Sequence, residues 1–157
     1  MNVDHFRKYI VRDSLKAAKW WSPAVENIIL GTGLVESNLE NLIQIGCGVA
    51  RGIYQIEPRS YADVLTYIKR DPDKVSNILT SCSMTSLPED VNAVIWNLRY
   101  ATLITRMFYY RVPEALPKSD DAIGLTQYYI QHYNCGGKAT IERDLPIFKQ
   151  VCENKEW

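Results

Sequence analysis

The residues best suited to chemistry are a glutamate that ends an apolar stretch and a glutamine that follows a glycine-bearing loop. The glutamate is Glu36, which precedes Ser37, and the glutamine is Gln55 in segment 52–58 (GIYQIEP). A carboxyl group carries a proton at neutral pH only when it is partly desolvated. Apolar residues near Glu36 supply such surroundings: Ile28, Ile29, Leu30, Leu34, Val35 and Leu39. The arrangement suits a general acid held against a sugar groove.

Length and charge restrict the class of protein. The 157 residues predict one domain over residues 1–157 with a sizeable core. The formal net charge is zero, so no overall field draws the chain to nucleic acid or to an anionic membrane. The sequence contains no apolar run long enough to span a bilayer. Residues 1–8 also lack the basic-then-apolar order of a signal peptide. We therefore expect neither a nucleic-acid partner nor a membrane span.

Metal-binding and redox residues are few: Cys47, Cys82, Cys135, Cys152, His5 and His132. The cysteine spacings match no zinc or redox template, and two histidines supply a metal cage poorly. We expect no metal and no cofactor, and free, mostly buried thiols. A bridge between Cys47 and Cys135 remains an alternative, since both are predicted in loops beside the same groove.

Helical patterns dominate the chain. Apolar spacing and capping residues predict helices over residues 4–20, 22–38, 58–69, 71–81, 88–111, 119–132 and 140–151. The longest should begin at a capping box formed by Ser86 and Glu89, and its nearly all-apolar circumference predicts a buried position. Glu36 would lie in the last turn of its helix. The fold is predicted to be mainly α, with at most a minor β element near residues 42–56.

Three motifs in this order give the chain a resemblance to a known family. They are Glu36-Ser37, segment 52–58, and Tyr133-Asn134 followed by Gly136-Gly137. They are similar to the Glu-Ser, Gly-Leu-Met-Gln-x-x-Pro and Tyr-Asn-Ala-Gly motifs of the lysozyme-like lytic transglycosylases. Segments 96–101 (WNLRYA) and 111–117 (RVPEALP) resemble the small bacteriophage type. Two departures are Cys135 in place of the usual alanine and the sequence of loop 46–51.

The resemblance implies a lysozyme-like single domain that cleaves peptidoglycan glycan strands with one carboxyl group. Glu36 would protonate the departing glycosidic oxygen and then, as a carboxylate, take the proton of the 6-hydroxyl of the same muramic acid. That hydroxyl would attack internally and give a 1,6-anhydro product.

Five further residues are predicted to bind substrate: Ser37, Tyr54, Gln55, Tyr133 and Asn134. Ser37 would hold the N-acetyl or carboxyl group, and Gln55 would present its amide to the sugar or to Glu36. Tyr133 would direct its hydroxyl toward Glu36 or the sugar, and Asn134 would shape the turn below the groove.

Several of the candidate residues have a structural alternative. Ser37 could bond to the preceding turn of its own helix. Tyr54 and Tyr133 could be core residues with satisfied hydroxyls. Glu57 is a candidate second carboxylate for lysozyme-type hydrolysis, although its position before Pro58 favours a role at the start of the next helix.

The resemblance also predicts biological partners. We expect a phage virion protein of the tail, made in the host cytoplasm without a signal peptide, which opens the wall from the periplasm during host entry. Other virion proteins would be its binding partners, and tethering would supply high local concentration. The alternatives are a hydrolytic lysozyme that acts at host lysis and a catalytically silent tail protein on a lysozyme-like scaffold.

Overall fold

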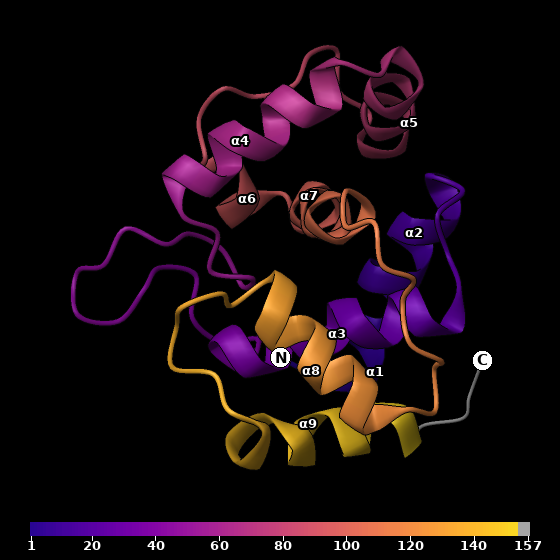
Figure 1. Ribbon diagram of the computed structural model, residues 1–157. Helices are drawn as coiled ribbons and strands as arrows, with labels where there is room; N and C mark the ends of the chain where they lie inside the picture. The colour runs from indigo at the N-terminus through magenta and orange to yellow at the C-terminus, as the bar shows by residue number, and fades with distance from the viewer. Residues whose placement is uncertain (154–157) are drawn as a thin grey trace.

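Helix α3 (Pro23–Ser37) runs through the centre of the computed structural model, which describes residues 1–153 (Figure 1). Ser22 caps this helix by accepting the N–H of Val25 at 3.2 Å, and Pro23 stands in the first turn. Every residue from Val25 to Gly33 is buried, as in a helix that lies within a core. The predicted capped helix is confirmed.

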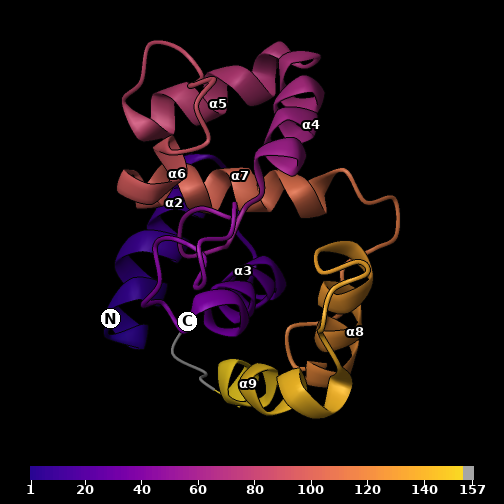
Figure 2. The ribbon, with the colours of Figure 1, turned by 90° about the vertical axis from the view of Figure 1, so that its left-hand side faces the viewer.

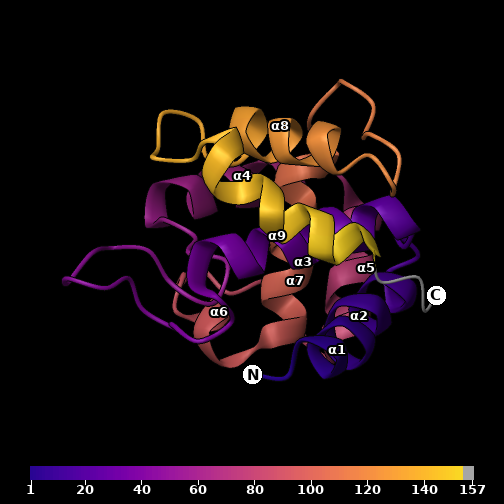
Figure 3. The same cartoon turned by 90° about the horizontal axis from the view of Figure 1, so that it is seen from below.

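Two helices close the lower side of the domain. Helix α8 (Ala122–His132) is capped by Asp121, and α9 (Ile141–Glu153) packs against both α8 and α3. Seen from below, α9 crosses α3 (Figure 3). A side chain at Gly31 would overlap the ring of Phe148, so glycine permits this close crossing. Both predicted helices are confirmed.

The N-terminal helix is continuous but irregular. It consists of α1 (Val3–His5), a π-helical stretch η1 (Phe6–Arg12) and α2 (Asp13–Ala17). The pattern predicted regular helix to residue 20. The helix ends earlier, and Lys19 adopts a left-handed backbone with φ of 62°.

A buried carboxylate joins this N-terminal helix to α3 and α9. Glu26 has no exposed surface and accepts hydrogen bonds from Arg7 (3.3 Å), Arg12 (2.8 Å) and Trp21 (2.6 Å). The second Nη of Arg7 donates to the carbonyl of Val151 at 2.7 Å. A buried charge is tolerated when it is paired and hydrogen-bonded in this way.

Helices α4 (Pro58–Lys69) and α5 (Pro72–Cys82) form the upper layer. Each has a proline at its first position, and Asp71 caps α5 by accepting the N–H groups of Asp73 and Lys74. Both helices agree with the predicted ranges. Figures 1 and 2 show this layer above α7, with α3, α8 and α9 below.

The predicted long helix over 88–111 is wrong in its first part. The structure has a short α6 (Ala93–Trp96) and then α7 (Leu98–Tyr110), while residues 88–92 are not helical and include a bend at 89–90 and a turn at 91–92. The break is at Asn97, whose backbone is extended (φ −113°, ψ 92°) and whose side chain accepts the N–H of Tyr100 at 2.9 Å. Asparagine offers the backbone this capping alternative, and apolar spacing alone does not reveal it. Trp96 is left 69% exposed on α6.

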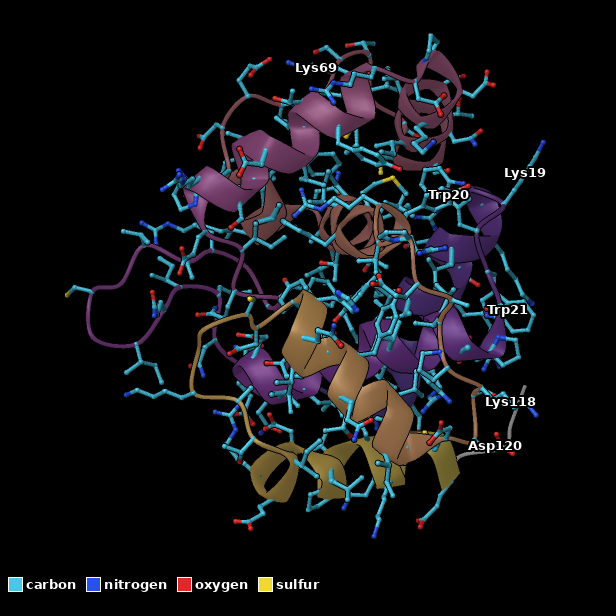
Figure 4. The ribbon with its side chains drawn as sticks, in the orientation of Figure 1. Lys19, Trp20, Trp21, Lys69, Lys118 and Asp120 are labelled. Atoms are coloured by element: carbon cyan, nitrogen blue, oxygen red, sulfur yellow. The ribbon has the colours of Figure 1, made fainter. Side chains whose placement is uncertain are left out.

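Residues 40–56 form a long loop between α3 and α4. Isolated bridges pair Arg51 with Ile43 and with Ile56, which agrees with the minor β content predicted here. The loop projects on the left of Figure 1. Trp20 and Trp21, labelled in Figure 4, lie on the opposite side, at the turn between α2 and α3. The described residues form one compact, mainly α domain, as predicted.

Candidate active site

A cleft of about 630 Å³ lies between the α3–α4 loop and the turn between α8 and α9. Both segments are on the left of Figure 1. The cleft is lined by Glu36, Asn41, Gln44, Ile45, Ala50, Gln55, Ile56, Glu57, Ser60, Phe108, Tyr133, Asn134, Cys135, Gly136, Gly137 and Lys138. Four of the predicted site residues are among them, together with the candidate second carboxylate: Glu36, Gln55, Tyr133, Asn134 and Glu57.

Glu36 lies in the last turn of α3, at the inner wall of the cleft. The helix ends because Asn38 adopts the left-handed conformation (φ 53°), with its N–H on the carbonyl of Leu34 at 2.9 Å. The end of a helix that is otherwise buried therefore carries this carboxyl group to a solvent-accessible surface.

One oxygen of Glu36 is held by two donors. The Tyr129 hydroxyl donates to Oε1 at 2.6 Å, and Nδ2 of Asn134 donates to the same atom at 3.2 Å. Oε2 has no hydrogen-bond partner among residues 1–153. An oxygen that accepts two hydrogen bonds resembles the carbonyl oxygen of a carboxylic acid. The proton of the acid therefore belongs on Oε2.

The surroundings of Glu36 raise its pKa above the usual 4.5, and burial is the largest cause. The hydrogen bonds from Tyr129 and Asn134 oppose this rise, as does the positive charge of Arg143. Tyr129 stays a neutral donor, because burial and the nearby Glu36 raise its own pKa. This combination keeps a proton available while fixing the carboxyl group.

Tyr133 was predicted to direct its hydroxyl toward Glu36 or the sugar, and this is wrong for Glu36. Its hydroxyl donates to the carbonyl of Tyr54 at 2.6 Å. The residue that contacts Glu36 is Tyr129, one helical turn earlier, whose ring stacks on that of Tyr133 with centroids 6.0 Å apart. Residues four apart share a helix face. The prediction for Tyr133 therefore identified the helix face that contacts Glu36, but the hydroxyl in contact belongs to Tyr129.

Ser37 and Tyr54 lie outside the cleft lining. The Ser37 hydroxyl is 2.7 Å from the carbonyl of Ile53 and 3.3 Å from that of Gly33, which includes the predicted bond to the preceding turn. Tyr54 is fully buried, and its hydroxyl is 2.9 Å from Oγ1 of Thr102. The structure therefore gives Ser37 a connecting role and Tyr54 a core role, and it corrects the expectation that they bind substrate.

Gln55 lines the floor of the cleft in a tight turn. Its Nε2 donates to the carbonyls of Gly52 (2.8 Å) and Asn41 (3.3 Å). Gly52 has φ of 70°, and a side chain there would lie 2.6 Å from the carbonyl oxygen of Val94, so the turn requires glycine. The Oε1 of Gln55 has no hydrogen bond within the described chain and can accept one from a sugar.

Asn134 closes the turn after α8 and contacts Glu36 at the same time. Its carbonyl accepts the N–H of Gly137 at 3.1 Å. Its side-chain Oδ1 is buried without a partner in residues 1–153 and packs against Gly137. A side chain at Gly137 would overlap this atom, which explains the glycine.

Glu57 occupies the position before α4, but its side chain makes no capping hydrogen bond. It is exposed and lines the same cleft as Glu36. The structure therefore puts two carboxyl groups in one cleft. Glu36 is half-buried and held by donors, whereas Glu57 is exposed and its side chain makes no hydrogen bond or ion pair within residues 1–153.

All four cysteines are free. Cys82 and Cys152 are half-buried, whereas Cys47 and Cys135 are exposed on the two loops that border the cleft. The expectation of mostly buried thiols is therefore wrong for the second pair. Within residues 1–153, no group of three or more histidines, cysteines, aspartates or glutamates could hold a metal ion. No helix in that range is long and apolar enough to cross a bilayer.

Comparisons with protein-family models, with curated proteins and with solved structures find no match to this chain. The cleft itself therefore indicates which chemistry the chain can perform. It offers an acid with a free, solvent-accessible oxygen, the free amide oxygen of Gln55 and the exposed carboxylate of Glu57. These groups can protonate a bound ether oxygen and bind hydroxyl or amide groups around it.

Proposed function

We propose that the chain cleaves peptidoglycan glycan strands as a lytic transglycosylase with Glu36 as its acid and base. The observation that carries the proposal is the Glu36 carboxyl group, held through Oε1 by Tyr129 and Asn134 with Oε2 free in an open cleft. The motifs that resemble the family converge on this place: Glu36 and segment 52–58 meet the turn after Tyr133.

In the proposed reaction, the Oε2 proton passes to the oxygen that links muramic acid C1 to the next sugar, and that bond breaks. Oε2 then accepts the proton of the muramic acid 6-hydroxyl as its oxygen bonds to C1. Glu36 ends as it began, no water is consumed, and the product carries a 1,6-anhydro ring. Removing a proton-transfer group of this kind typically costs about 10²- to 10⁴-fold in rate.

The position of Glu57 supports a second candidate, hydrolysis of the same bond. A second carboxylate in the cleft could activate water and give a reducing end. Mass spectrometry separates the two reactions, because a hydrolysed fragment is heavier than an anhydro fragment by one water. Anhydro ends alone would support the lyase, and reducing ends alone would replace it with the hydrolase.

The decisive experiment is a murein clearing assay with three proteins: wild type, Glu36→Gln and Glu40→Gln. Glu40 is an exposed glutamate just beyond α3 and does not line the cleft, so it is a matched control. We expect clearing by wild type and Glu40→Gln only. Failure of folded wild type to clear murein would favour the silent scaffold instead.

The virion and tail association is a proposal carried by the resemblance to the small bacteriophage type. Immunodetection of the chain in purified particles, with a non-structural phage protein as the negative control, tests it. A protein found only in lysed cells and never in particles would favour the endolysin role.

A further inference from the structure

A second cavity, of about 130 Å³, opens on the other side of the domain from the cleft. It lies where the second half of α7 and the middle of α8 meet the connector between them. Its lining residues are Arg106, Tyr109, Tyr110, Val112, Glu114, Leu116 and Tyr128. In Figure 4, the labelled Lys118 and Asp120 mark this connector on the right, while the cleft loops lie on the left.

Arg106 is the unusual residue of this cavity. It is half-buried, and its Nε is buried without a hydrogen-bond partner in residues 1–153. The only close partner described for its guanidinium is the ring of Tyr110, at 4.7 Å from the centroid. Burial lowers the Arg106 pKa, so the charge is held in surroundings that do not favour it.

Other arginines that are buried or half-buried in the described chain each hold an oxygen acceptor. Arg7 and Arg12 bind Glu26, Arg51 binds the carbonyls of Gly48 and Ala50, and Arg99 binds that of Ser81. Desolvating an arginine without such an acceptor is costly, and arginine rarely lies inside a protein unless paired. Arg106 has no such oxygen acceptor in the described chain. We infer that a ligand supplies the acceptor.

The remaining lining limits what this acceptor can be. Tyr128 already donates its hydroxyl to the carbonyl of Glu114 at 2.9 Å, and Tyr109 shares its hydroxyl with Thr32 at 2.6 Å. Within residues 1–153, the donors left free in the lining are the Arg106 guanidinium and the Tyr110 hydroxyl, and the guanidinium matches a planar carboxylate in a two-pronged geometry. Val112 and Leu116 offer apolar contact for a small substituent. The volume suits a group about as large as one small amino acid.

We propose that this cavity, the Arg106 pocket, binds a small carboxylate, with the carboxylate on the Arg106 guanidinium and an apolar substituent against Val112 and Leu116. Free short-chain acids and the C-terminal residue of a short peptide share this chemistry. The inference does not depend on glycan cleavage, because it concerns different residues on a different side of the domain.

The test is a titration of the ¹⁵N-labelled protein, followed through the arginine Nε–Hε resonances. Three probes are used separately at constant ionic strength: acetate, N-acetyl-D-alanyl-D-alanine and inorganic phosphate. We expect acetate or the dipeptide to shift the Arg106 resonance saturably, with a Kd in the millimolar range or tighter, about −4 kcal/mol or better. Tighter binding of the dipeptide than of acetate would identify a peptide end as the source, and the reverse order a free acid.

Three variants sharpen the titration. Arg106→Gln should abolish the saturable change in the neighbouring tyrosine ring signals. Arg111→Gln, on an exposed arginine five residues further along at the end of α7, should preserve it. Glu114→Gln should tighten binding several-fold, because it removes from the cavity lining a negative charge that repels a carboxylate ligand. Far-UV circular dichroism and thermal melts confirm that each variant is folded.

Three results would overturn the proposal. One is the absence of any saturable shift at Arg106 up to about 50 mM acetate and dipeptide, well above a millimolar Kd. A second is equal binding by folded Arg106→Gln. A third is clearly tighter binding of phosphate than of either carboxylate.

Discussion

The Tyr129 hydroxyl and the Glu36 carboxyl group share a hydrogen bond of 2.6 Å that links α8 to the end of α3. Its donor cannot move freely, because the Tyr129 ring stacks on Tyr133 and packs 5.8 Å from the ring of Phe148 on α9. Since this bond is accepted by Oε1, Oε2 is the oxygen that remains free in the cleft and carries the proton. Orientation of the acid is therefore a property of the packing between α3, α8 and α9.

Tyr129→Phe removes that bond while keeping the ring. A hydrogen bond to a carboxylate is worth about 1.5–3 kcal/mol, so we expect kcat/KM on murein fragments to fall roughly ten- to hundredfold. Because the bond favours ionised Glu36, its loss should raise the Glu36 pKa further and move the alkaline limb of the pH–rate profile to higher pH. Tyr133→Phe is the matched control, since it loses a bond to the Tyr54 carbonyl and should leave that limb in place. An identical shift in both variants would count against the assignment of Tyr129.

The pH dependence of activity should follow the raised pKa of Glu36. In the proposed reaction the free protein is active while Glu36 is protonated. Activity should therefore persist above pH 4.5, the usual pKa of this group, and fall as pH passes the higher folded-state value. The pH profile of kcat/KM measures this limb. A profile that already falls at pH 4.5 would mean that Glu36 titrates like a surface carboxylate.

Stability should depend on the same group in a predictable direction. Glu36 is protonated in both states below pH 4.5; as pH rises, the unfolded state ionises first, so stability is lost between that value and the folded-state pKa. Glu36→Gln lacks this loss, and its amide oxygen can still accept from Tyr129 and Asn134. We expect its melting temperature to match wild type in acid and to exceed it at neutral pH. A variant that melts lower at every pH would show that the ionised group stabilises the fold.

Ser37→Ala tests the connecting role of this hydroxyl. It leaves the carbonyl of the fully buried Ile53 without the Ser37 donor, at a cost of about 1–3 kcal/mol. We expect a lower melting temperature with KM for murein fragments nearly unchanged in the folded protein. An unchanged melting temperature with a several-fold higher KM would restore Ser37 to the substrate-binding residues.

Local capping signals made most of the helices predictable. Ser22, Asp71 and Asp121 act as caps at the places where their types and spacing indicate them. The wrong prediction of a continuous helix through Asn97 also arises from side-chain capping. An asparagine within an apolar stretch can cap as well as continue a helix, and only packing decides between the two.

The site was predictable in part from the three motifs. Glu36, Gln55 and Asn134 belong to motifs far apart in the sequence, and their resemblance to the family, rather than any local pattern, indicated that they share a cleft. They did not find Tyr129, whose selection over Tyr133 depends on where the Tyr54 carbonyl lies. They also gave no sign of Arg106, because the absence of a partner is visible only in three dimensions.

Arg7 donates hydrogen bonds to both Glu26 and the Val151 carbonyl, and these bonds limit how early the domain can fold during translation. On the ribosome, residues near the amino terminus emerge long before α9, so Arg7 lacks its Val151 acceptor until translation of the domain is almost complete. Phe148, which covers Gly31, and the ring contact beneath Tyr129 arrive equally late. The cleft should therefore mature only after α9 has left the ribosome, and a polypeptide that stops before α9 should lack the ordered Glu36 site.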